Sequence, residues 1–208
     1  MIKHLVGQLG HFVIAGLTFV GRSVTLTGRA FAWIARGQLG GQETINQMAH
    51  VGANSIPLVM LTVGFTGAVM TLHTVLMIVQ LGAQSYVGKG VALTVLRELG
   101  PTIAAVVVAA RVGASIAAEL GTMKVTEQVD ALESLAIDPV RYLVVPRVLA
   151  CFLLTPLLTC YAVLMGALGA WAIYAGMFGG ESQPYWEYTR QTLLGWDLYT
   201  GLFKAFFF

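Results

Sequence analysis

Charged residues are scarce in this sequence. Only 11% of the 208 residues are Asp, Glu, Lys or Arg, whereas 57% are hydrophobic, and the mean hydropathy is +0.76. A soluble domain carries about 25% charged residues, so this chain has too few charges to cover a surface that faces water on all sides. The composition excludes a soluble enzyme, a nucleic-acid-binding domain and a disordered chain, and it predicts an integral membrane protein.

Residues that bind metals or form disulfides are also few. Cys151 and Cys160 lie in one apolar run, at a spacing that puts them on opposite sides of a helix, so they cannot pair within it. None of the four histidines is accompanied by a cysteine or carboxylate at ligand spacing. The sequence therefore predicts no metal site, and it shows no nucleophile–base set that would make a catalytic centre.

Residues 1–43 combine apolar stretches with regularly spaced arginines. Arg22, Arg29 and Arg36 recur every seven residues and drift by only about 20° per step, so all three lie on one helix face. This pattern predicts an amphipathic helix in the membrane surface with the three arginines facing lipid headgroups. The alternative is a short first span with a basic flank, but glycine and polar residues interrupt the apolar run and favour the surface helix.

Three apolar blocks are long enough to cross a membrane, at residues 56–81, 91–118 and 148–180. Pro57 stands at the start of the first block. Residues 181–197 are polar and aromatic, which predicts an interface loop. A fourth apolar block, 198–208, is too short to span a bilayer, so we expect this sequence to be a fragment of a longer chain.

Basic residues are concentrated before the first predicted span and after the second. They are Lys3, Arg22, Arg29 and Arg36 on the N-terminal side, and Lys124, Arg141 and Arg147 in the later loop. The positive-inside rule therefore predicts that the N-terminus and residues 119–147 are cytoplasmic. The three spans would then run outward, inward and outward.

The second predicted span carries charges and a stripe of small residues. The stripe recurs every four residues and predicts a face where another helix approaches closely; it consists of Ala105, Ala109, Gly113, Ala117 and Gly121. Arg97 and Arg111 share a face about 21 Å apart on an α-helix, and Glu98 adjoins Arg97. For Arg111, a side chain that reaches the cytoplasmic interface is an equally good interpretation.

The Arg97–Glu98 pair precedes Leu99-Gly100-Pro101, which predicts a helix break at membrane depth. Such breaks usually line a cavity, and intramembrane charges usually face a cavity, a partner or a headgroup. A cation and an anion at a cavity wall suit a zwitterionic or anionic lipid headgroup.

The predicted cytoplasmic segment 119–138 has the pattern of a short amphipathic helix. Thr126 is the expected N-cap, acidic residues recur from Glu127 through Asp130, and Asp138-Pro139 ends the helix. The segment is either a solvated loop or a docking surface for a cytosolic protein.

Several motifs occur in a specific order along the chain: LRELGP at 96–101, ARVGA at 110–114, AELGTMKVTEQVDAL at 118–132, DP at 138–139, YLV at 142–144, PR at 146–147 and PLL at 156–158. In this order they resemble the MlaE/YrbE family of ABC transporter permeases, which work with MCE proteins in lipid transport. The resemblance extends over roughly residues 10–208.

The resemblance implies an all-α integral membrane protein with a single permease domain at 1–208. It implies an N-terminal interfacial helix and about five spans, of which the fourth is truncated here and the C-terminal part is missing. It implies a homodimer in the inner membrane that moves phospholipid or a related lipid between the inner and outer membranes. The partners would be a cytosolic ATPase, which binds ATP and Mg²⁺, and a periplasmic or membrane-anchored MCE-domain protein, so the permease itself needs no cofactor and is not an enzyme.

The resemblance also implies roles for individual residues. Arg97, Glu98 and Arg111 would line the lipid cavity. The segment 119–138 would be the coupling helix that contacts the ATPase, through Glu119, Thr122, Met123, Lys124, Thr126, Glu127, Asp130 and Leu132.

Two other functions remain as alternatives. An ion-coupled secondary transporter could use Glu98, His73 and Arg111 as a relay, but it predicts an inverted repeat, and the Arg-Glu-Leu-Gly-Pro pattern occurs once. A non-transporting membrane scaffold is disfavoured by the charges at membrane depth.

Overall fold

The computed structural model describes residues 2–37, 40–80, 90–91, 93–193 and 196–207, and this part of the chain is helical without strands. The all-α fold class is therefore confirmed. The helices are α1 (Ile2–Ala35), α2 (Gly41–Gln80), the π-helix η2 (Leu93–Leu99), α4 (Gly100–Val125), α5 (Gln128–Ser134), the π-helix η3 (Val140–Val144), α6 (Val145–Phe178), α7 (Ser182–Leu193) and α8 (Trp196–Phe207).

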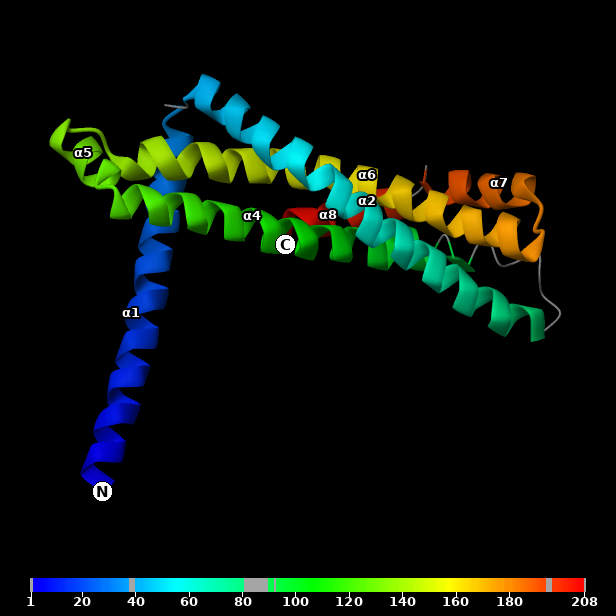
Figure 1. The fold of residues 1–208 in the computed structure, drawn as a ribbon, viewed down its shortest axis with the longest axis horizontal. Coiled ribbons are helices and arrows are strands. Elements are labelled where there is room, and N and C mark those ends of the chain that lie inside the picture. Colours follow the sequence, from blue (N-terminus) through cyan, green and yellow to red (C-terminus); the bar gives the residue numbers. More distant parts are fainter. Residues whose placement is uncertain (1, 38–39, 81–89, 92, 194–195, 208) are drawn as a thin grey trace.

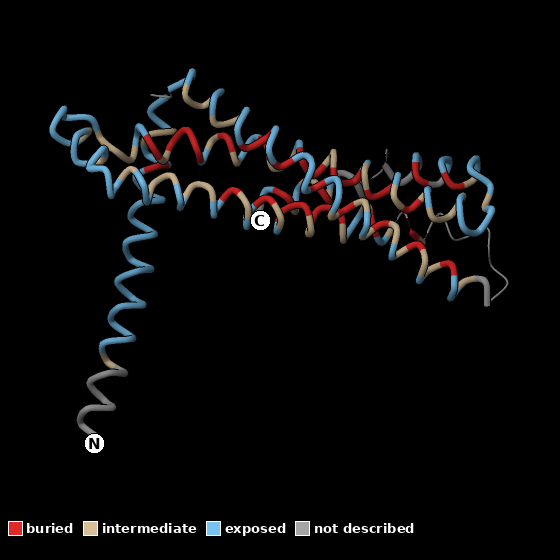
Figure 2. The backbone as a smooth tube through the Cα atoms, in the orientation of Figure 1, coloured by how far each residue is buried: buried red, intermediate tan, exposed pale blue. Residues whose placement is uncertain are grey.

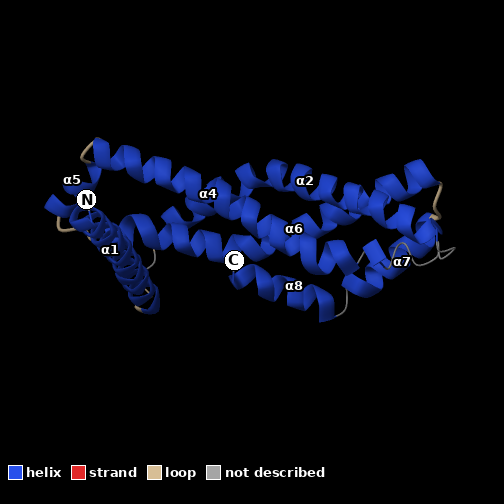
Figure 3. Cartoon of the chain, turned by 90° about the horizontal axis from the view of Figure 1, so that it is seen from below, coloured by secondary structure: helices blue, strands red, loops and turns tan. Residues whose placement is uncertain are grey.

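Three helical segments are long and apolar enough to cross a membrane: Gly41–Ile78, Leu93–Val125 and Val140–Phe178. They lie side by side along the long axis of the molecule (Figures 1 and 3). The first begins well before residue 56, so Pro57 lies inside α2 and not at its start. A proline inside a helix removes one backbone hydrogen bond, and the helix continues on both sides of Pro57.

The predicted helix break at 99–101 is wrong. η2 passes directly into α4, and Leu99 keeps a right-handed helical backbone. Pro101 falls in the first turn of α4, where its missing N–H matters little. Gly100 is needed for packing, because a Cβ there would lie 2.8 Å from the Val95 carbonyl oxygen and 3.1 Å from Val163 Cγ2.

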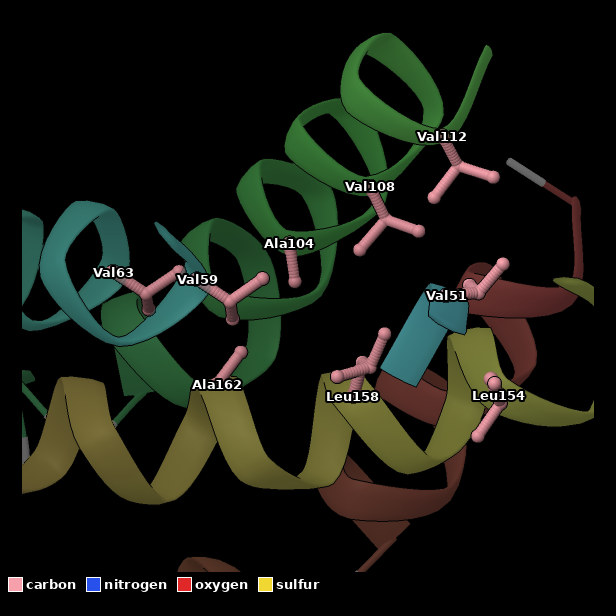
Figure 4. Close-up of a cluster of buried hydrophobic side chains, with 9 residues drawn as sticks. All are labelled: Val51, Val59, Val63, Ala104, Val108, Val112, Leu154, Leu158 and Ala162. Atoms are coloured by element: carbon pink, nitrogen blue, oxygen red, sulfur yellow. The ribbon is translucent and has the colours of Figure 1, made fainter. Parts of the chain in front are cut away.

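The core lies where α2, α4 and α6 meet. Its buried side chains come from all three helices (Figure 4): Val51, Val59 and Val63 from α2, Ala104, Val108 and Val112 from α4, and Leu154, Leu158 and Ala162 from α6. These short side chains let the three backbones lie close together while excluding lipid from between them.

The closest helix approach uses glycines of α2 and α6. A Cβ added at Gly67 would overlap the Gly166 carbonyl oxygen, and a Cβ added at Gly169 would overlap the Gly64 carbonyl oxygen. Of the small-residue stripe predicted on α4, Ala105 is buried in the bundle, whereas a Cβ added at Gly113 or Gly121 would meet no described atom within 4 Å. Within the described part of the chain, the glycines of α2 and α6 therefore make the closest approach, and a helix approach along the exposed part of the α4 stripe stays a prediction.

Residues 182–193 form α7, so the predicted interface loop is wrong. Tyr185 and Thr189, one helical turn apart, are both buried, and the Tyr185 hydroxyl donates to the Ala167 carbonyl oxygen at 2.8 Å. Burial of this face against the rest of the chain stabilises a helix whose other residues are mostly polar. α8 follows and runs back along α4 and α6 (Figure 3).

α1 leaves one end of the bundle and runs across the direction of the three long helices (Figure 1). Its residues 11–29 are exposed (Figure 2), including large apolar side chains such as Phe12, Leu17 and Phe19. The same end of the bundle carries α5 and the start of α6. The N-terminal arginines and the basic 119–147 segment therefore lie at one end, as the positive-inside argument requires.

Candidate functional site

The predicted coupling segment is two helices and not one. α4 continues to Val125, and the separate helix α5 begins at Gln128 and ends at Ser134, before Asp138-Pro139. The expected N-cap at Thr126 is wrong, because its hydroxyl donates back to the Thr122 carbonyl oxygen at 2.8 Å. Glu127 occupies the N-cap position with a left-handed backbone (φ 58°), which turns the chain sharply between the two helices.

The turn between α4 and α5 presents a mostly exposed, charged surface. Lys124 Nζ donates to Asp130 Oδ1 at 2.6 Å, which ties the end of α4 to α5. Thr122, Thr126 and Glu127 are exposed nearby, while Met123 and Leu132 are half-buried. Seven of the eight predicted docking residues therefore gather at this tip.

Glu119, the eighth, is engaged within the bundle. Arg147 Nη2 donates to Glu119 Oε2 at 2.9 Å, and His50 Nε2 lies 3.7 Å from Glu119 Oε1. The Arg147 side chain is only 6% exposed and also donates from Nη1 to the Leu143 carbonyl oxygen. Glu119 thus connects α2, α4 and α6, and its part in docking stays a prediction.

A second polar cluster joins α1 to the segment before α6. Asp138 Oδ2 accepts hydrogen bonds from Trp33 Nε1 (3.1 Å) and Arg29 Nη2 (3.2 Å), and Asp138 Oδ1 accepts from the Val140 backbone N–H (2.9 Å). Burial opposes ionisation of Asp138, but the Val140 amide, the Trp33 indole and the Arg29 guanidinium together hold the pKa of Asp138 below its ordinary value. The carboxylate is therefore charged at neutral pH.

The three arginines predicted to face lipid headgroups are all exposed. Arg29 pairs with Asp138, and the Arg36 guanidinium lies over the Trp33 ring at 5.1 Å. The headgroup contact stays a prediction for all three residues, and the structure adds protein partners for Arg29 and Arg36.

The intramembrane charges form two separate groups. Arg97 Nε lies 3.6 Å from Glu98 Oε1, and Lys204 Nζ of α8 donates to Glu98 Oε2 at 2.5 Å. Arg111 instead donates from Nη1 to Ser55 Oγ of α2 at 3.0 Å. The α-helical spacing that put Arg97 and Arg111 on one face does not hold, because Arg97 lies in the π-helix η2.

Lys204 is the residue that sequence reasoning missed. The available signal was a single lysine within the apolar block 198–208, since an isolated cation at membrane depth needs an anionic partner. The sequence does not reveal that the partner is Glu98.

The sequence is similar to those of known membrane transport proteins. The profile of the family described as Permease MlaE matches residues 44–208. A probable ABC transporter permease protein of Synechocystis sp. is 39% identical over 183 residues, which cover 88% of this chain and 70% of that protein. The intermembrane phospholipid transport system permease protein MlaE of Haemophilus influenzae is 34% identical over 166 residues, covering 79% of this chain and 63% of the relative.

A plant protein is similar as well. Protein TRIGALACTOSYLDIACYLGLYCEROL 1, chloroplastic, of Arabidopsis thaliana is 33% identical over 180 residues, which cover 86% of this chain and 51% of the plant protein. The family match begins at residue 44 of α2 and includes the other two long helices, the α4–α5 tip and α8.

Proposed function

The chain belongs to the MlaE family of ABC transporter permeases, and on that premise we propose that it moves phospholipid between the inner and outer membranes, driven by a partner ATPase. The observation that carries this proposal is the family match across the three spans and the exposed α4–α5 tip. Similarity to a protein named as a phospholipid permease supports the choice of substrate.

We place the α4–α5 tip, and with it the N-terminus, in the cytoplasm of a cell with the permease in its inner membrane. The tip would dock the ATPase, which binds ATP and Mg²⁺. α1 would lie in the membrane surface, since it runs across the spans at that end and exposes apolar side chains along its length. The family resemblance adds a second copy of the permease and an MCE-domain protein as further partners.

The Arg97–Glu98–Lys204 group is the proposed contact for a lipid headgroup. One carboxylate between two cations leaves a net positive charge, which complements a phosphate group. Arg111 would contribute from a separate position on α4, where Ser55 holds it.

Reversing Glu98 to lysine is expected to lower phospholipid binding about tenfold or more and to lower transport with it. The substitution sets three cations side by side, which disrupts the arrangement that positions Arg97 and Lys204. Bound phospholipid in the purified complex is measured by mass spectrometry. The exchanged pair Glu98→Lys with Lys204→Glu is the control and should recover part of the binding; equal binding in all three proteins would remove this group from the lipid path.

Reversing Glu127 or Asp130 to lysine is expected to weaken association of the ATPase about tenfold while the permease stays inserted. Both side chains are exposed at the α4–α5 tip, and Asp130 also holds Lys124. Co-purification of the ATPase with tagged permease measures the effect. The matched control is Glu187→Lys, an exposed acid on α7 at the other end of the bundle. Full ATPase recovery with the Glu127 and Asp130 variants would show that docking lies elsewhere.

The function as a whole is tested by purifying the tagged permease from native membranes in mild detergent. Recovery of an ABC ATPase, an MCE protein and phospholipid supports the proposal. Recovery of the permease alone, under conditions that preserve other ABC complexes, favours an ion-coupled transporter or a scaffold.

A further inference from the structure

α1 is attached to the rest of the chain through a small contact. Ala30 is its one buried residue among those whose side chains the structure describes, and Arg29 and Trp33 flank it on the same face. Residues 11–28 are all exposed, so the described contact of α1 with the rest of the chain is concentrated near its C-terminal end (Figure 2). The position of α1 relative to the bundle therefore depends on the few residues at this contact.

Asp138 is the centre of that contact. Its side chain is 23% exposed and accepts from Trp33 and Arg29 of α1 with one oxygen and from its own segment, at Val140 N–H, with the other. Charge-assisted hydrogen bonds of this kind are stronger than neutral ones. Asp138 thus connects α1 to the start of η3, because it accepts hydrogen bonds from both.

The Trp33 ring adds a second connection at the same place. The guanidinium of Arg36, just after α1, lies 5.1 Å from the ring centroid, and that of Arg141, in η3, lies 5.3 Å from it. Arg141 therefore contacts α1 from the same segment as Asp138. A cleft of about 580 Å³ lined in part by Trp33, Asp138 and Tyr142 leaves this junction accessible and not enclosed in the core.

Asp138 lies at a position that links α1 to both α5 and the third span. The residue lies between α5, which ends at Ser134, and the start of the third span at Val140. Residues 135–139 are the chain segment that joins α5 to η3 and α6, so Asp138 lies on the direct connection between them. We infer that Asp138 is a positioning residue that ties the membrane-surface helix α1 to the α5–α6 connection, so that α1 and the docking tip move together when the ATPase acts.

This inference rests on the proposed function for its effect on transport, but the tether itself is a property of the chain. If α1 is held in the membrane surface, it gives the α5–α6 connection a fixed point, and movement of the ATPase is transmitted to the spans. Without the tether, α1 no longer holds the α5–α6 connection, so movement of the ATPase would be transmitted less completely to α6 and ATP would be hydrolysed with less lipid moved.

The test uses the permease in complex with its ATPase, reconstituted in phospholipid vesicles. Asp138→Asn and Trp33→Phe are expected to keep ATPase binding and to lower the lipid moved per ATP hydrolysed about fivefold or more. Asp138→Glu, which keeps the charge, should recover part of the ratio. Glu187→Gln, the same kind of change at an exposed site on α7, is the control and should leave the ratio unchanged.

A cross-link separates positioning from a general structural role. Trp33→Cys with Asp138→Cys, in a chain with Cys151 and Cys160 replaced by alanine, removes the tether, and a short bismaleimide then restores it covalently. We expect the lipid-to-ATP ratio to be low before cross-linking and to rise severalfold after it. An unchanged ratio after complete cross-linking, or a normal ratio in Asp138→Asn, would overturn the inference.

Amide hydrogen exchange distinguishes failure of the tether from failure of the proposed function. Asp138→Asn should raise exchange in both residues 29–36 and residues 128–138 relative to the wild type. If the wild-type complex moves no lipid, the proposed function fails, and the tether is still judged by exchange. Exchange that is unchanged in either segment contradicts the tether whatever the transport result.

Discussion

Replacing Gly169 with leucine is expected to prevent the folded bundle from forming. A Cβ at this position already overlaps the Gly64 carbonyl oxygen, and the overlapping atom belongs to the backbone, so no side-chain rotation relieves it. α2 and α6 would have to separate, which also opens the core that they share with α4. We expect a loss of more than about 3 kcal/mol in the free energy of unfolding, larger than ordinary overpacking of side chains.

Thermal unfolding and size-exclusion chromatography of the purified variant in detergent measure this effect. The control is Gly176→Leu on the same helix, because Gly176 is exposed and a Cβ there meets no described atom within 4 Å. Gly67→Leu should behave like Gly169→Leu, since it faces the Gly166 carbonyl oxygen. A monodisperse Gly169→Leu protein with the melting temperature of the wild type would show that α2 and α6 do not pack as described.

Replacing Glu119 with leucine is expected to lower the free energy of unfolding by about 3 kcal/mol. The substitution leaves the buried Arg147 guanidinium with the Leu143 carbonyl oxygen but without its carboxylate partner. The value lies at the low end for a broken buried ion pair because Glu119 itself is 37% exposed. Denaturant unfolding in detergent, followed by tryptophan fluorescence, gives the change.

A double variant tests the cause of this loss. Adding Arg147→Met to Glu119→Leu removes the unpaired charge and should restore stability to within about 1 kcal/mol of the wild type. Glu133→Leu, at an exposed acid on α5, is the single-site control and should change stability little. A double variant as unstable as Glu119→Leu alone would mean that the loss has another origin.

Local sequence patterns predicted the parts of the fold that depend on composition. The three spans follow from long apolar blocks, because any helix in lipid needs such a block. The basic residues near Arg29 and near Arg141 predicted that these segments share one end of the molecule, and the contact of Arg29 with Asp138 agrees. The tip at Lys124–Asp130 was expected as a charged element between two spans, and it is one.

Features that depend on how helices rotate against one another could not be predicted in this way. The Glu98–Lys204 bond joins residues 106 positions apart, and it requires α8 to lie beside η2. The π-helical winding of η2 changes which residues share a face, and no single residue between 93 and 99 signals it. Arg111 therefore bonds to Ser55 and does not lie with Arg97, although α-helical spacing predicted one face for both arginines.

The sequence of α7 predicts a loop, and the helix could not be predicted because its stability depends on contacts with the rest of the chain. Its composition is polar, and the helix is stabilised by the burial of Tyr185 and Thr189 against the rest of the chain. Their spacing of one turn was present in the sequence, but a two-residue pattern carries little weight until a neighbouring surface is known.

ATP-dependent movement of phospholipid through the reconstituted permease decides whether this chain is a lipid permease. The wild-type complex of permease, ATPase and MCE protein is placed in vesicles that contain a fluorescent phospholipid, and transfer of the label is followed with ATP, with a non-hydrolysable analogue and with a proton gradient. We expect transfer with ATP only, and loss of that transfer with Glu127→Lys in the permease. Transfer driven by the proton gradient without ATP, or no transfer from an assembled complex that hydrolyses ATP, would contradict it.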